Sequence, residues 1–144
     1  MPFRKNRKSH DEVIDRLAGV AFFEGFDDKE LARVAELAEV VEAEEGTHLT
    51  EQGKPGLECF VILEGHAGVY VGDDKIAVNR EGEVVGEMAL IEHGPRIATV
   101  IAESSMRLLQ FDAKRFRMLL DEMPKASQRI MTELSRRLRE QNLH

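Results

Sequence analysis

Glycine residues recur throughout the middle of this chain, between residues 40 and 111. They are Gly46, Gly53, Gly56, Gly65, Gly68, Gly72, Gly82, Gly86 and Gly94. The apolar runs between and after them are short, at 59–63, 68–71, 98–102 and 106–111. Apolar runs of this kind, bounded by Gly, Asp or Glu, are typical of strands joined by tight turns. Their spacing of roughly ten residues predicts an antiparallel β-roll similar to a jelly roll.

Helical patterns flank this region on both sides. Before it, apolar residues recur at three- and four-residue steps and indicate two short helices. These residues are Val13, Leu17, Val20, Leu31, Val34 and Leu37. Asp27 followed by Glu30 has the form of a capping box, so we expect the second helix to begin there. We expect the phenylalanines between the two helices to fill the core.

Helix is also predicted after the β-region, over 114–122 and 125–141, with Pro124 between the two segments. Ile130, Leu134 and Leu138 follow one another at four-residue steps on the last helix. This helix either packs on its own sheet or forms the seam of a homodimer, and the pattern leaves both open. The predicted fold class is therefore α+β: an antiparallel β-roll with N-terminal helices and a C-terminal helix.

Length, charge and cysteine content restrict the class of protein further. With 144 residues the chain is one ordinary domain. It has one cysteine, Cys59, which we expect to be a buried strand residue, so no intrachain disulfide can form. No apolar run reaches the roughly 18 residues of a membrane span, and no signal peptide is present, so we expect a cytoplasmic protein.

The net charge of −7 is unevenly distributed. Residues 1–10 carry four basic and no acidic side chains, and we expect them to form a flexible basic arm before a domain over 11–144. Residues 114–144 carry eight basic and four acidic side chains. The middle holds eight basic and 23 acidic residues, which argues against general nucleic-acid binding.

The segment 86–100 contains the groups that suit ligand binding. It begins with a glycine and an acid, Gly86 and Glu87, and continues through a short apolar turn to a Gly-Pro break and Arg96. The start of a helical turn presents backbone N–H groups that stabilise an anion, and an arginine fork can bind two of its oxygens. Glu87 suits a ligand that also donates a hydrogen bond, such as a sugar hydroxyl. Together these groups describe a site for a ribose cyclic phosphate.

Gly86-Glu87-x-Ala89-Leu90 followed by Pro95-Arg96-x-Ala98-Thr99-Val100 resembles the phosphate-binding cassette of cyclic nucleotide-binding domains. Proteins with such domains include the regulatory subunit of protein kinase A and the catabolite activator protein family. The resemblance covers roughly residues 17–141 and implies a module that binds cyclic AMP, or cyclic GMP, as a ligand. It implies no cofactor and no metal, and we expect no enzymatic activity.

The resemblance also implies roles for individual residues. Arg96 is expected to pair with the cyclic phosphate, and Glu87 to accept from the ribose 2′-hydroxyl. Backbone N–H groups near Gly86 complete the phosphate site, at Met88, Ala89 and Leu90 and after Arg96. Apolar walls around the sugar and base are expected from Val69, Ala77, Val84, Val85 and Ala98.

Two further positions bear on specificity and signalling. Ile97 stands where the family usually has Ala, Ser or Thr, and its side chain offers no hydroxyl to a guanine, which favours cyclic AMP over cyclic GMP. Arg137 on the last helix aligns with an arginine that reaches the phosphate or the purine in relatives. In the family this helix folds over the base as a lid.

The expected output is regulation in trans, since no DNA-binding, kinase or channel segment follows the lid helix by residue 144. We expect ligand to move the C-terminal helix and so change a surface that an unknown protein partner, or a second copy of the chain, contacts. One alternative is a degenerate domain of the same fold that binds no nucleotide and acts in dimerisation or docking. The other is a β-barrel metal enzyme, for which the isolated histidines His48, His66 and His93 provide no ligand cluster.

Overall fold

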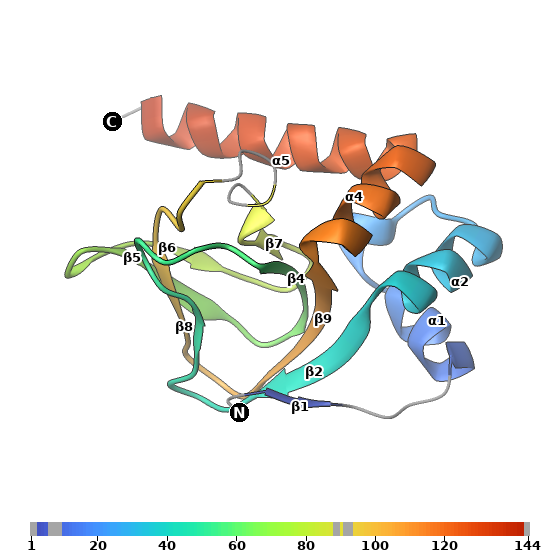
Figure 1. Ribbon diagram of the computed structural model, residues 1–144, viewed down its shortest axis with the longest axis horizontal. Coiled ribbons are helices and arrows are strands. Elements are labelled where there is room, and N and C mark those ends of the chain that lie inside the picture. Colours follow the sequence, from blue (N-terminus) through green and yellow to red (C-terminus); the bar gives the residue numbers. More distant parts are fainter. Residues whose placement is uncertain (1–2, 6–9, 88–89, 91–93, 143–144) are drawn as a thin grey trace.

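The computed structural model describes residues 3–5, 10–87, 90 and 94–142. Two antiparallel sheets form the β-roll predicted for the middle of the chain (Figure 1). The larger sheet has, in spatial order, β1 (Phe3–Lys5), β2 (Glu39–Ala43), β9 (Met106–Asp112), β4 (Glu58–Glu64) and β7 (Val84–Val85). The smaller sheet has β3 (His48–Thr50), β8 (Thr99–Ala102), β5 (Ala67–Val71) and β6 (Asp74–Asn79).

The larger sheet has apolar residues on both faces, and each face contributes to a different core. On β4, Phe60 and Ile62 point into the roll, where they meet residues of the smaller sheet such as Val100. The alternate residues Val61 and Leu63 point the other way, toward the helices. Successive side chains of a strand point to opposite faces, so this nearly continuous apolar run serves both cores.

The two N-terminal helices are α1 (His10–Ala18) and α2 (Asp28–Leu37), with a short 3₁₀ turn, η1 (Ala21–Phe23), between them. The predicted capping box is confirmed: Asp27 accepts from the Glu30 N–H at 2.8 Å, and Glu30 accepts from the Asp27 N–H at 3.0 Å. The intervening aromatic rings are buried and pack edge to face: Phe22, Phe23 and Phe26.

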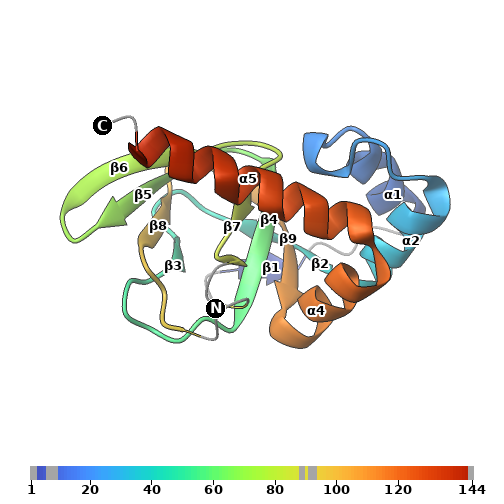
Figure 2. The ribbon, with the colours of Figure 1, turned by 90° about the horizontal axis from the view of Figure 1, so that it is seen from above.

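The C-terminal helices are α4 (Ala113–Glu122) and α5 (Pro124–Asn142), which meet at Pro124 as predicted. Ala126 and Ile130 of α5 are buried in the helix-side core. Beyond them α5 continues across the top of the roll, above β7 (Figures 1 and 2). None of the helices in the described part of the chain is long and apolar enough to cross a bilayer.

Residues 3–5 depart from the flexible arm predicted over residues 1–10. They form β1, which pairs antiparallel with β2 and places Phe3 opposite Ala43. The Phe3 ring stacks on Phe60 with 5.4 Å between ring centroids. An aromatic residue within the basic segment therefore packs on an apolar partner in the roll. The charge pattern of residues 1–10 gave no indication of this packing.

Candidate functional site

Arg96 is held in place by backbone pairing with the turn that follows β3. The Gly53 N–H donates to the Arg96 carbonyl at 2.9 Å, and the Arg96 N–H donates to the Lys54 carbonyl at 2.8 Å. Farther along, the Thr50 hydroxyl donates to the Ala98 carbonyl at 2.9 Å. These bonds fix the backbone on both sides of Arg96, so the direction of its side chain is set by the fold.

The guanidinium of Arg96 is buried, with a relative exposure of 6% for the residue. Its Nη1 donates to the Gly86 carbonyl at 2.8 Å, and its Nη2 donates to the Glu58 carbonyl at 2.5 Å. Each of these nitrogens carries two hydrogens, so a second donor remains on each for another acceptor. The group can therefore bind an anion while it stays attached to the roll.

The charge of Arg96 is balanced by two acids. Burial lowers the pKa of Arg96 from its ordinary value, while the carboxylates of Glu58 and Glu87 raise it. A Glu58 carboxylate oxygen lies 3.8 Å from Arg96 Nη2. Because arginine titrates far above neutral pH, the guanidinium keeps its charge in this buried position. A buried charge of this kind is well suited to an anionic ligand.

Gly86 allows the close approach of backbone and guanidinium. Its φ is +84°, in the left-handed region. A Cβ placed on Gly86 lies 2.5 Å from Arg96 Nη1, closer than Cβ atoms approach their neighbours, so a side chain here requires the guanidinium to shift. Glycine satisfies both conditions without strain, so this turn residue and the arginine ten positions later form one structural unit.

Glu87 follows this turn and is one of the most deeply buried charged residues described, with a relative exposure of 1%. Its carboxylate also acts on Cys59, whose thiol pKa is raised well above its ordinary value by burial first and by Glu87 second. Cys59 is fully buried, as predicted. The structure thus brings Glu87, Arg96 and Cys59 into one electrostatic environment, with the thiol in its protonated form.

The residues predicted to form the apolar walls of the pocket lie in different parts of the structure. Val69 and Val85 belong to the core inside the roll, and Val69 pairs with the exposed Ala77 across β5 and β6. Ala98 is half-buried. Val84 is the exception: its side chain lies in the helix-side core, so its prediction as a pocket wall is wrong. Adjacent residues of β7 face opposite ways, and only Val85 faces the roll interior.

Where the structure describes them, the other residues predicted to contact the nucleotide do not lie together in the roll interior. Ile97 is 66% exposed, so it does not fill the roll interior. Leu90 is buried in the helix-side core. Met88 and Ala89 lie outside the described residues, and Arg137 lies within α5.

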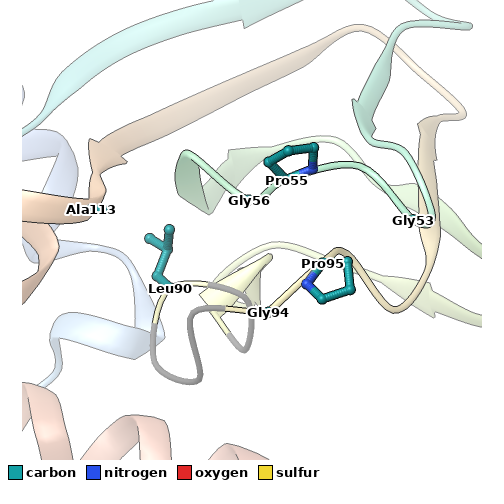
Figure 3. Close-up of a pocket in the computed structure, with 7 residues that line it drawn as sticks. All are labelled: Gly53, Pro55, Gly56, Leu90, Gly94, Pro95 and Ala113. Carbon is teal, nitrogen blue, oxygen red and sulfur yellow. The ribbon is translucent and has the colours of Figure 1, made fainter.

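A pocket of about 410 Å³ adjoins the Arg96 segment (Figure 3). Its lining residues come from the turn after β3, the Gly-Pro break and the start of α4, together with Leu90: Gly53, Pro55, Gly56, Leu90, Gly94, Pro95 and Ala113. Among the predicted ligand residues it contains Leu90 alone. This pocket therefore lies beside the arginine and acid constellation and does not coincide with it.

The sequence analysis missed several residues that organise the site. Glu58 holds Arg96 through its carbonyl, and no sequence signal marks a backbone acceptor. Glu133 and Arg136 of α5 contact the segment before Gly86: the Val84 backbone N–H donates to Glu133 Oε1 at 3.3 Å, and Arg136 Nη2 pairs with the Glu83 carboxylate oxygen Oε2 at 2.8 Å. Glu133 and Arg136 are three residues apart, which places them on one face of α5, and this spacing was the available signal for the contact.

Metal ligands show no comparable arrangement. Among the described residues, no three His, Cys, Asp or Glu side chains lie together in a way that could hold a metal ion.

Comparison with known proteins gives a consistent picture. The family model described as the cyclic nucleotide-binding domain matches residues 40–123. A protein kinase A regulatory-subunit domain bound to Sp-2Cl-cAMPS has a TM-score of 0.77 and 24% identity, over 92% of this chain and 91% of that one. A cyclic nucleotide-binding domain from Methylobacillus flagellatus has a TM-score of 0.75 and 24% identity, over 91% of this chain and 79% of that one.

A third structure shares the fold with a different description. It is the regulatory subunit of a cAMP-independent protein kinase A from Trypanosoma brucei, with a TM-score of 0.70 and 24% identity. The match covers 88% of this chain and 49% of that one, so this chain spans about half the length of that neighbour.

Proposed function

The chain belongs to the cyclic nucleotide-binding domain family, and from this premise we propose that it is a cytoplasmic cyclic-nucleotide sensor that prefers cyclic AMP to cyclic GMP. In this proposal the protein binds its ligand without converting it. Arg96 pairs with the cyclic phosphate, and Glu87 accepts a hydrogen bond from the ribose 2′-hydroxyl.

The observation that carries the proposal is that the Arg96 guanidinium and the Glu87 carboxylate are both buried and interact electrostatically. Each terminal nitrogen of Arg96 keeps a donor hydrogen beyond its carbonyl contact, and a singly charged phosphate is a suitable partner for such an arginine fork. Glu87 is an acceptor when ionised, so it complements a ligand that donates a hydroxyl hydrogen. A cyclic nucleotide presents both groups on one ribose ring.

The preference for cyclic AMP rests on Ile97. Its side chain is 66% exposed beside Arg96 and has no polar atom. A guanine amino or carbonyl group gains no hydrogen bond from it and loses hydration on binding. Adenine has fewer such groups to satisfy, so the penalty for cyclic AMP is smaller.

The signal is proposed to leave through α5. This helix contacts the segment just before Gly86 and Glu87: Arg136 pairs with the Glu83 carboxylate, and Glu133 accepts from the Val84 backbone N–H. A ligand that draws Gly86 and Glu87 toward its phosphate and ribose also shifts the segment that α5 holds. The resulting movement of α5 changes the surface offered to a partner protein or to a second copy of the chain.

A non-binding docking module is the second candidate. The Trypanosoma brucei neighbour supports keeping it, since a protein with this fold is described as cAMP-independent. In this candidate Arg96 has a structural role, joining β4 to the Gly86 turn through its two carbonyl contacts.

Calorimetric titration with cyclic AMP and cyclic GMP separates the two candidates. The sensor proposal predicts micromolar or tighter binding of cyclic AMP, about −8 kcal/mol, and weaker binding of cyclic GMP. Arg96→Ala should cost about 2–5 kcal/mol of that free energy, and Glu87→Ala about 1.5–3 kcal/mol.

Arg80→Ala is the matched control, because Arg80 is an exposed arginine on the same roll and its removal should leave the affinity unchanged. Absence of heat at millimolar nucleotide, with the wild-type protein folded, favours the docking module.

A further inference from the structure

The N-terminal strand places an aromatic ring inside the β-roll. Phe3 is half-buried and packs against the core of the roll. Its ring stacks on that of Phe60 at 5.4 Å between centroids, with 30° between the ring planes. Phe60 is fully buried, so the Phe3 ring covers a residue of the core of the roll.

This contact crosses the curved sheet and does not join neighbouring strands. The order β1, β2, β9, β4 separates Phe3 from Phe60 by three strand spacings, which is about 14 Å in a flat sheet. The curl of the sheet brings the two rings together across the roll. Ala43, the residue paired with Phe3, is buried and belongs to the same core.

Phe60 is in turn connected to the candidate site. It pairs with Val85 across β4 and β7, and Val85 belongs to the same core as Phe3. Val85 directly precedes Gly86, whose carbonyl accepts from Arg96 Nη1 at 2.8 Å. The ring of Phe3 therefore supports the strand pair that holds the backbone acceptor of Arg96.

We propose that Phe3 is a positioning residue for the nucleotide site, acting through Phe60 and Val85 on the Gly86 turn; this inference rests on the proposed function above. Without the ring, Phe60 loses the packing on one side and β7 loses its fixed distance from β4. The Gly86 carbonyl then departs from the position that orients Arg96, and the affinity for cyclic AMP falls.

The test compares substitutions of Phe3 in the full chain. Phe3→Ala is expected to weaken cyclic AMP binding about three- to tenfold in calorimetry, the range that one aromatic pair provides. Phe3→Leu retains apolar volume and should recover most of the affinity. Arg4→Ala is the control on the same strand, since Arg4 is exposed, and it should bind as the wild type does.

General loss of stability is controlled separately. Ile14→Ala removes a partly buried side chain from the helix-side core and lowers the melting temperature without touching the roll. If affinity follows melting temperature across Phe3→Ala and Ile14→Ala, Phe3 has no positioning role and the proposal is overturned. Unchanged or tighter binding by Phe3→Ala also overturns it.

Hydrogen exchange without nucleotide keeps this test distinct from that of the proposed function. Phe3→Ala should raise the exchange of amides in residues 84–87 severalfold while leaving α2 unchanged, and Arg4→Ala should change neither. If wild-type protein binds no cyclic nucleotide, the proposed function fails, and the exchange result still decides whether Phe3 supports the Gly86 turn. Unchanged exchange at 84–87 overturns that support.

Discussion

Arg136 of α5 lies 2.8 Å from Glu83, three residues before the Gly86 turn that holds Arg96. The pair joins the helix proposed to transmit the signal to the segment proposed to bind the ligand. Both side chains are partly exposed, so their contribution to stability is small, about 0–1 kcal/mol.

Charge reversal tests whether this pair couples the helix to the site. Glu83→Arg should raise hydrogen exchange in residues 131–139 of α5 and reduce the exchange change that cyclic AMP causes there. Combining it with Arg136→Glu should restore both, because the attraction is re-formed with opposite sign. Arg139→Ala, another exposed arginine on α5, is the control. Equal exchange in the single and double variants contradicts the coupling.

Gly86→Ala should abolish nucleotide binding and destabilise the fold. A left-handed φ costs an alanine about 1–2 kcal/mol, and the new Cβ also meets Arg96 Nη1 at 2.5 Å. Gly46→Ala separates the two effects, since Gly46 has a φ of +90° with no atom near its Cβ position. Denaturant melts should show a larger loss for Gly86→Ala. Equal losses contradict the close approach of Gly86 and Arg96.

The Arg33–Glu122 pair between α2 and α4 predicts a pH dependence. Arg33 Nε lies 2.8 Å from Glu122 Oε1, and this hydrogen bond lowers the pKa of Glu122 from its ordinary 4.5. A lowered folded-state pKa means that the contribution is complete above pH 4.5 and is lost as the pH falls through the lowered value.

Thermal melts between pH 7 and pH 3 should therefore show Glu122→Gln less stable than wild type at neutral pH and equal to it in acid. Glu45→Gln, an exposed acid in the turn after β2, should follow the wild type throughout. A wild-type advantage that persists or grows in acid contradicts the assignment.

Cys59 should be inert in the native protein. Its thiol is fully buried, and burial raises its pKa, so the reactive thiolate is scarce at pH 8. Labelling with a thiol-specific disulfide reagent should proceed only as fast as the protein opens, and cyclic AMP should slow it by stabilising the folded state. Rapid labelling of folded protein, at the rate of a free thiol, contradicts this burial.

The sequence predicts strands with long apolar runs better than strands without them. The runs at 59–63 and 106–111 are confirmed as β4 and β9, because their apolar residues supply both cores and leave a strong signal. β1 and β7 have three and two residues, too few to show a pattern. Their conformation comes from pairing with β2 and β4, which is a tertiary effect.

In the candidate site, too, some residues could be predicted from the sequence and others could not. Glu87 and Arg96 were selected by side-chain chemistry, and the structure brings both into one buried environment. Glu58 was missed because it holds Arg96 mainly through a carbonyl that every residue possesses. Val84 was assigned to the wrong face because two adjacent valines look alike in sequence, while the direction of each depends on the register of β7 with β4.

A crystal structure of the protein grown with cyclic AMP would show whether Arg96 and Glu87 bind the nucleotide. We expect phosphate oxygens at about 2.7–2.9 Å from the Arg96 guanidinium, with the ribose 2′-hydroxyl on the Glu87 carboxylate. Nucleotide bound instead in the pocket beside Gly94 and Pro95, with Arg96 still bound to protein carbonyls alone, would contradict this expectation.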